Sequence, residues 1–242
     1  MFNLNQIRLL ALSTVLGACV SSASAQKTFV NATSGAAGNT TLANGGLFSP
    51  PLNGTTGADQ LWEERTTFAS GGNVFESQGE SAGENAPRLA VNLSLANGTY
   101  NIYAYFWSPG TETADNQQQW LLRAGLQNTA EELQLYSRVL GVVTTPVNEP
   151  GMQIATQVTS GDGFDVAPTL FTENSRNLWE AYLGQAVVNN GTLQVFIDDY
   201  SPATTVNNRT WFDGVGFSVV PEPSSIALFG LGLAGMLARR RK

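Results

Sequence analysis

Short runs of strand-forming residues, each bounded by turn residues, constrain the fold of this chain more than any other feature. The dipeptide Asn-Gly, which is typical of tight turns between strands, occurs four times, beginning at Asn44, Asn53, Asn97 and Asn190. Runs rich in Val, Leu, Thr and aromatic residues predict strands at residues 28–32, 89–95, 97–105, 120–126, 134–143, 153–158, 178–188, 190–198 and 210–220. The first of these is expected at a sheet edge, followed by loops as far as residue 56.

Helical patterns are almost absent between the two ends of the chain. Only residues 129–136 fit a short helix, and they fit a strand as well; no long segment has the apolar spacing of a helix. The sequence therefore predicts an all-β domain, an antiparallel β-sandwich or jelly roll, over residues 26–220.

The composition of this domain excludes several kinds of chemistry. The chain has no histidine, and its one cysteine, Cys19, lies in an apolar run near the N-terminus. Ser-His-Asp triads, thiolate nucleophiles, disulfides and His- or Cys-ligated metals are therefore excluded from the domain. Residues 26–220 contain 18 acidic and 7 basic residues, a net charge of −11. This charge disfavours nucleic acid and anionic lipid as partners.

The N-terminus has the three parts of a secretory signal peptide. Arg8 supplies the positive charge, residues 9–18 are apolar, and Ala23 and Ala25 form a cleavage site before Gln26. We expect residues 1–25 to be removed on export. Residues 16–19, Leu-Gly-Ala-Cys, also fit a bacterial lipobox, in which Cys19 would be lipidated and become the N-terminus.

The C-terminus, residues 221–242, also has three parts. Two prolines flank an acid in Pro221-Glu222-Pro223, an uncharged segment follows, and four cations end the chain. The segment predicts a transmembrane helix of about 15 residues or ~22 Å, which snorkelling cations extend toward the ~30 Å bilayer core. Its large apolar residues are Ile226, Leu228, Phe229, Leu231, Leu233, Met236 and Leu237, and the cations are Arg239, Arg240, Arg241 and Lys242. The cations stay cytoplasmic, which leaves the β domain outside.

This tail resembles the PEP-CTERM sorting signal of Gram-negative bacteria, with Pro221, Glu222 and Pro223 at the motif positions. The resemblance implies that an exosortase cleaves the tail while the protein is transiently anchored in the inner membrane. It also implies release to the cell surface or extracellular matrix. Tails of this kind are also described as ice-binding protein C-terminal segments, a label that concerns sorting and gives no evidence of ice binding.

The most unusual segment of the domain is a run of aromatic residues in the predicted strand at its centre. Alternation places Ile102, Ala104 and Phe106 on one face as core, and Tyr103, Tyr105 and Trp107 on the other. The second set is either the covered side of a strand buried on both faces or an exposed platform that stacks on sugar rings. A platform requires at least two exposed rings.

Acidic residues supply the other candidate sites. Asp162 and Asp165 lie in a Gly-rich turn, and Asp198 and Asp199 end a predicted strand. Their oxygens suit Ca²⁺, although neither pair has the spacing of a defined calcium loop and both fit solvated turns. Adjacent acids at 63–64, 131–132 and 198–199 point to opposite faces of a strand, so they cannot flank one glycosidic bond.

The last predicted strand carries a short resemblance of its own. Residues 209–218 resemble the final strand of galactose-binding-like jelly rolls and related carbohydrate-binding modules, with Asp213 as a residue that caps the turn at Gly214. We expect a secreted, non-catalytic module that binds exopolysaccharide or surface glycan, or that packs with matrix polymer. The alternative is an extracellular polysaccharide hydrolase that uses two carboxylates distant in the sequence.

Overall fold

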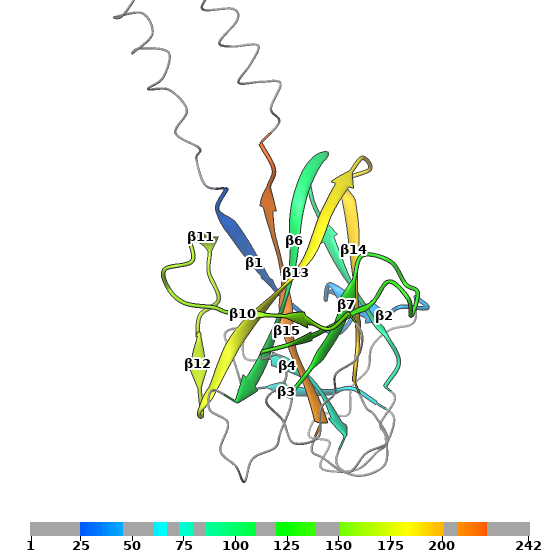
Figure 1. Cartoon of the computed structure of the whole chain (residues 1–242). Helices are drawn as coiled ribbons and strands as arrows, with labels where there is room; N and C mark the ends of the chain where they lie inside the picture. The colour runs from blue at the N-terminus through cyan, green and yellow to red at the C-terminus, as the bar shows by residue number, and fades with distance from the viewer. Residues whose placement is uncertain are drawn as a thin grey trace, which may run out of the picture.

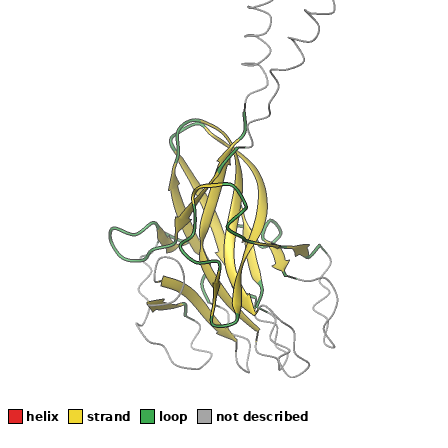
Figure 2. Cartoon of the chain, turned by 90° about the vertical axis from the view of Figure 1, so that its left-hand side faces the viewer, coloured by secondary structure: helices red, strands yellow, loops and turns green. Residues whose placement is uncertain are grey.

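The computed structural model describes residues 25–45, 61–66, 73–79, 86–109, 120–138, 151–200 and 208–221. These residues form strands, turns and loops, and none of them is helical (Figures 1 and 2). The prediction of an all-β, sandwich-like domain is therefore confirmed. Among the same residues, no helix is long and apolar enough to cross a membrane. The predicted signal peptide as far as residue 24 and the tail from residue 222 lie outside the described residues.

The strands form two sheets, which we call sheet A and sheet B. Sheet A has the order β10-β13-β6-β15-β1-β11, with β12 beside β13, β4 beside β15 and β3 beside β4. Its strands are β1 (Lys27–Asn31), β3 (Glu63–Thr66), β4 (Asn73–Gly79), β6 (Gly98–Pro109), β10 (Thr156–Gln157), β11 (Phe164–Val166), β12 (Thr172–Glu173), β13 (Arg176–Val188) and β15 (Asn208–Val219).

Sheet B has the order β2-β5-β14-β7-β8-β9. Its strands are β2 (Thr40–Leu42), β5 (Leu89–Ser94), β7 (Leu122–Gly125), β8 (Gln134–Ser137), β9 (Gln153–Ile154) and β14 (Thr192–Asp198). Pairing is antiparallel throughout both sheets except between β1 and β11 and between β8 and β9.

Three details differ from the sequence-based expectation. Strand β1 lies between β15 and β11 and is not an edge strand, because its two sides pair with different partners. Residues 129–136 contain turns followed by β8 and no helix. Strands β2, β3, β4, β11 and β12 were not predicted, because their sequences are short or polar.

Two of the Asn-Gly turns carry the chain from one sheet to the other at the same end of the sandwich. The first links β5 to β6 and the second links β13 to β14. The Leu95 N–H donates to the Gly191 carbonyl (3.0 Å), and the Gly191 N–H donates to Asn97 Oδ1 (3.2 Å). Gly191 has a φ of 79°, which favours glycine at this turn.

The inner faces of the two sheets enclose the main core. The predicted inner row of β6, Ile102, Ala104 and Phe106, is fully buried there. It packs with residues of β5 and β14 such as Val91 and Ile197. The alternation of β6 was therefore predicted correctly for this face.

The outer face of sheet A carries a second core. Tyr105 and Trp107 of β6 pack there with Leu178, and the chain between β9 and β12 covers them with Val158 and Phe164. Strand β6 is thus buried on both faces over this part of its length.

Glycines on β15 make room for this outer layer. A Cβ at Gly216 would lie 2.7 Å from Tyr105 Cε2, and one at Gly214 would lie 2.4 Å from the Val30 carbonyl oxygen. The Phe29 ring meets Tyr105 edge to face at 5.2 Å. A side chain at Gly216 would push the Tyr105 ring away from the sheet, and one at Gly214 would clash with the backbone of β1 and with the Phe29 ring.

A buried network of charged side chains and tryptophan rings lies in sheet A, around β3, β4 and the first residues of β13 and β15. Glu76 is fully buried, and it pairs with Arg65 and with Arg209 (3.2 Å). The Arg176 guanidinium lies 4.8 Å from the ring centres of both Trp120 and Trp211. Burial, followed by the neighbouring Arg209, lowers the pKa of Arg176 from its ordinary value. Removing either arginine would destabilise the fold, because it would leave the buried Glu76 charge with less compensation.

Both ends of the described domain lie at one end of sheet A. Strand β1 runs antiparallel to β15, with Thr28 opposite Phe217 and Asn31 opposite Gly214. The start of β1 therefore lies beside the end of β15 (Figure 1). The sorting motif begins at Pro221, two residues beyond β15.

Substitution of Trp107 tests the outer core. We expect Trp107→Ala to lower the free energy of unfolding by about 3–5 kcal/mol, because it leaves a cavity between the sheet and its cover. Ile154→Ala serves as the control, since Ile154 is 54% exposed, and it should change the value by less than about 0.5 kcal/mol. Denaturant unfolding of both variants measures the difference, and equal small effects would contradict a buried Trp107.

Candidate functional site

The aromatic row on the outer face of β6 is mostly buried. Tyr105 and Trp107 have no exposed surface, so of the two alternatives the strand buried on both faces is confirmed and a platform of at least two exposed rings is excluded. The Trp107 Nε1–H donates to Asp213 Oδ2 (3.1 Å), so Asp213 holds this indole rather than capping a turn at Gly214. Tyr103 alone remains partly exposed.

Tyr103 has an aromatic neighbour on the adjacent strand. Tyr182 of β13 lies opposite Tyr103 in the register, and the two ring centres are 5.6 Å apart with an angle of 47° between the planes. The Tyr182 side chain is 50% exposed. An aromatic pair therefore reaches the surface, but across two strands rather than along one.

Amide and hydroxyl groups lie beside this pair of tyrosines on the same face of the sheet. Asn101 Oδ1 accepts from the Tyr182 hydroxyl and from Gln185 Nε2, both at 3.2 Å. The Ser218 hydroxyl lies 3.4 Å from both Asn101 Nδ2 and the Tyr103 hydroxyl. We call Asn101, Tyr103, Tyr182, Gln185 and Ser218 the tyrosine–amide patch.

A bulge in β13 creates this arrangement. The register shifts between Tyr182 and Gly184, where the φ of Gly184 is 109°. Because of the shift, Tyr182 and Gln185 both lie on the outer face although they are three residues apart in sequence. Regular alternation would have placed one of them on the inner face.

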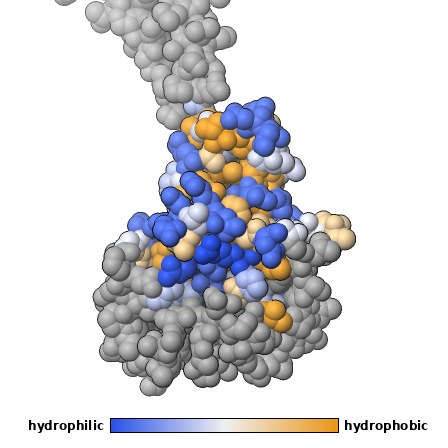
Figure 3. Space-filling view, turned by 90° about the vertical axis from the view of Figure 1, so that its right-hand side faces the viewer, coloured by the Kyte–Doolittle hydropathy of each residue, from blue (hydrophilic) through white to orange (hydrophobic). Residues whose placement is uncertain are grey.

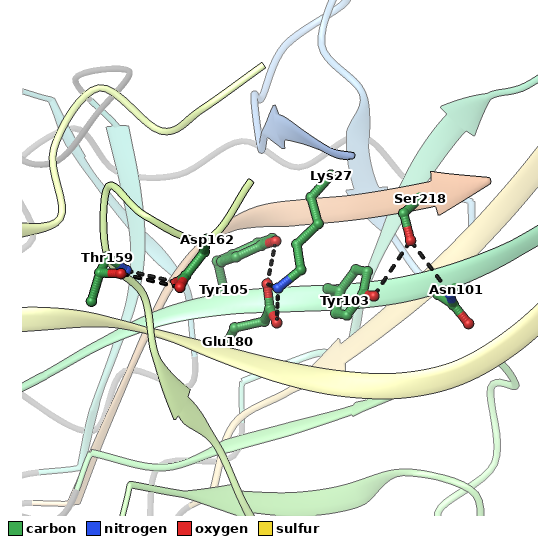
Figure 4. Close-up of polar contacts among 8 residues, drawn as sticks. All are labelled: Lys27, Asn101, Tyr103, Tyr105, Thr159, Asp162, Glu180 and Ser218. Carbon is green, nitrogen blue, oxygen red and sulfur yellow. Dashed lines mark hydrogen bonds and ion pairs between the residues drawn. The ribbon is translucent and has the colours of Figure 1, made fainter. Parts of the chain in front are cut away.

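A partly buried ion pair borders the patch (Figure 4). Lys27 Nζ lies 2.6 and 2.8 Å from the two carboxylate oxygens of Glu180, and the Tyr105 hydroxyl donates to Glu180 Oε2 (2.8 Å). Lys27 Nζ also lies 5.0 Å from the centre of the Tyr103 ring. Burial and the negative charge of Glu180 raise the pKa of Tyr105 far above its ordinary value, so it remains a neutral donor.

These groups define the chemistry that the patch can perform. Tyr182 presents an open ring, and Gln185 and Asn101 carry amides that both donate and accept hydrogen bonds. Such a surface suits an uncharged ligand with one apolar face and many hydroxyl groups.

The first candidate metal pair lies on the chain that covers sheet A. Asp162 accepts from the Thr159 N–H (2.7 Å) and from the Thr159 hydroxyl (3.1 Å), which is the turn-forming use of aspartate. Asp165 is exposed on β11. Asp162 thus stabilises its own turn.

The second pair lies at the end of β14, where the two side chains have different environments. Asp198 Oδ2 accepts from Arg88 Nε (2.9 Å), whereas Asp199 is buried and accepts from the Ser77 hydroxyl (2.9 Å) and the Ala86 N–H (3.3 Å). No group of three His, Cys, Asp or Glu residues lies together within the ranges that the structure describes. Calcium binding remains a prediction.

The acid pair at 63–64 belongs to the fold. Both side chains are buried, and Glu64 accepts hydrogen bonds from Ser34 and Asn73. Asp198, Glu76 and Glu180 likewise each pair with a cation.

Tyr182 and Gln185 were missed in the sequence, although strand 178–188 was predicted. Their position beside Tyr103 depends on the cross-strand register and on the bulge. Gly184, an isolated glycine within a strand pattern, was the one available signal, since it often marks a bulge.

The pH dependence of stability tests the burial of Asp199. Burial raises the pKa of Asp199 from 3.8 to about 7. A carboxyl group whose pKa is raised by folding stabilises the protein below the unfolded value, and this contribution is lost as the pH rises toward the folded value. Wild-type stability relative to Asp199→Asn should therefore fall between pH 4 and pH 7. Thermal unfolding across this range measures the effect, and parallel curves for the two proteins would contradict it.

Comparison with known proteins identifies the end of the chain. No curated protein matches the chain. Residues 219–242 match the family described as the PEP-CTERM protein-sorting motif, which confirms the resemblance of Pro221, Glu222 and Pro223 to that signal. The chain therefore carries a sorting signal that implies export, membrane-associated sorting and processing by an exosortase.

Proposed function

We propose that this protein is a non-catalytic, glycan-binding component of the cell surface or extracellular matrix. In this proposal the signal peptide and the sorting tail are removed, and the tyrosine–amide patch binds a neutral polysaccharide. The single observation that carries the proposal is the half-exposed Tyr182 ring beside Tyr103, bordered by the Asn101 and Gln185 amides.

The composition of the patch supports a sugar as the ligand. A pyranose ring has an apolar face that stacks on an aromatic side chain, and hydroxyl groups at its edge that hydrogen-bond with amides. The Tyr182 and Tyr103 rings supply the first kind of contact, and Asn101 and Gln185 supply the second.

The charges of the domain support a neutral ligand. The net charge of −11 over residues 26–220 repels anionic polymers. Lys27, whose Nζ lies 5.0 Å from the centre of the Tyr103 ring, is bound to Glu180 and so has its charge compensated.

The carboxylates support a binding role over hydrolysis. Glu180, the acid beside the patch, is 9% exposed and accepts from both Lys27 and Tyr105. These donors occupy both of its carboxylate oxygens, whereas an acid that cleaves a glycosidic bond must contact the substrate.

Removal of the Tyr182 ring tests the glycan site. We expect Tyr182→Ala in the exported full chain to weaken binding to neutral gluco-, galacto- or manno-oligosaccharides five- to tenfold, which corresponds to about 1 to 1.4 kcal/mol of stacking. Tyr182→Phe keeps the ring and should retain most of the affinity. Ile154→Ala, an exposed apolar residue in sheet B, is the control. No binding by the wild type, or equal binding by Tyr182→Ala, would contradict the proposal.

Replacement of the sorting motif tests the route of export. We expect Pro221→Ala, Glu222→Ala and Pro223→Ala together to block tail removal in an exosortase-containing host, while the apolar segment still retains the protein in the membrane fraction. Ser224→Ala with Ser225→Ala is a matched control next to the motif. Mass spectrometry of the membrane and secreted fractions measures processing, and normal release of the triple variant would contradict it.

A further inference from the structure

Strand β13 has an edge that is covered over only part of its length. On the side away from β6, β12 pairs with Arg176–Asn177 and β10 pairs with Trp179–Glu180. The Tyr182 carbonyl accepts from the Tyr136 hydroxyl (2.9 Å). Beyond this point, residues 183–188 have no further strand partner on that side among the residues that the structure describes.

The side chains along this open edge are uncharged and partly apolar. No charged residue occurs from 181 to 197. Val187 is 65% exposed on the outer face, and Leu183 and Ala186 are only partly buried against the inner core. β13 ends at the upper right in Figure 1, and Figure 3, which faces that side, shows apolar surface gathered over the upper part of the sandwich.

Open edges of this kind bind other strands unless they are protected. Natural edge strands are usually protected by charged residues, especially lysine, by proline, or by a covering segment. Residues 183–188 contain neither charge nor proline. The bulge at Gly184 is the one protective feature within them.

We infer that this edge pairs with the same edge of a second copy of the chain, antiparallel and about a two-fold axis. A two-fold axis makes one edge complementary to itself, because every donor meets an acceptor of the same segment. Because no charged residue lies along this edge, two domains of net charge −11 can meet there without placing like charges opposite each other. The edge also offers no charged group that could bind a partner of opposite charge.

The pairing also has a consequence for glycan binding, and this consequence rests on the proposed function. Joining two edges extends sheet A across both copies and keeps the two outer faces on the same side. Tyr182 and Gln185 lie on the strand at the junction, so the two patches form one surface. Two linked sites bind a polymer more tightly than either site alone.

The oligomeric state of the exported full chain in mild detergent tests the inference without any glycan. We expect a dimer by sedimentation at about 100 µM, and at least a tenfold higher Kd for Val187→Lys and for Val187→Glu. Because Lys and Glu change the net charge in opposite directions, weaker dimerisation of both variants cannot be explained by a change in the repulsion between the two copies. Val166→Lys is the matched control: Val166 is 50% exposed on β11, at the opposite edge of sheet A, and its dimer should be unchanged.

Three results would overturn the inference: a monomeric wild type, a dimer that survives both Val187 substitutions, or a dimer that Val166→Lys abolishes. Thermal unfolding should be nearly the same for all variants, because Val187 and Val166 are exposed. Glycan binding by a monomeric wild type would overturn the dimer while leaving the proposed function intact.

Discussion

The covering of β6 on both faces is the constraint on which the rest of the domain depends. Its inner row fills the space between the sheets, and Tyr105 and Trp107 require a separate apolar layer outside sheet A. That requirement fixes the path of the chain between β9 and β12, which crosses the sheet and brings Phe164 over the rings. It also accounts for the two glycines of β15, since side chains there would displace the layer.

The tyrosine–amide patch lies on the outer face of sheet A, beyond the segment that covers Tyr105 and Trp107. Lys27 and Glu180 lie at the boundary, with Tyr105 buried on one side and Tyr103 partly exposed on the other (Figure 4). The ion pair satisfies a carboxylate that burial would otherwise penalise. It therefore separates the apolar layer from a polar surface without leaving a charge uncompensated.

The sequence predicted those parts of the fold that depend on local patterns. Strands on either side of Asn97 and Asn190 and the inner row of β6 were predicted correctly, because turn chemistry and alternation are local properties. The sequence left open whether Trp107 is buried or exposed, since the chain that covers it is distant in sequence. The Tyr103–Tyr182 pair depends on a bulge and a register that no local pattern determines. The sorting motif was recognised because its three parts are contiguous.

The neighbouring positions of β1 and β15 have a mechanical consequence. A force applied between Lys27 and Val219 pulls on adjacent ends of an antiparallel pair, so it loads the hydrogen bonds between the strands one rung at a time, beginning at the pair Thr28 and Phe217. Bonds loaded in sequence separate under a smaller force than bonds loaded together in shear. The Lys27–Glu180 ion pair joins the first residue of β1 to β13, two strands beyond β15, so it must also be broken as the peeling begins. The domain therefore withstands tension between its own two ends poorly, whereas a pull through only one end places no load across this pair.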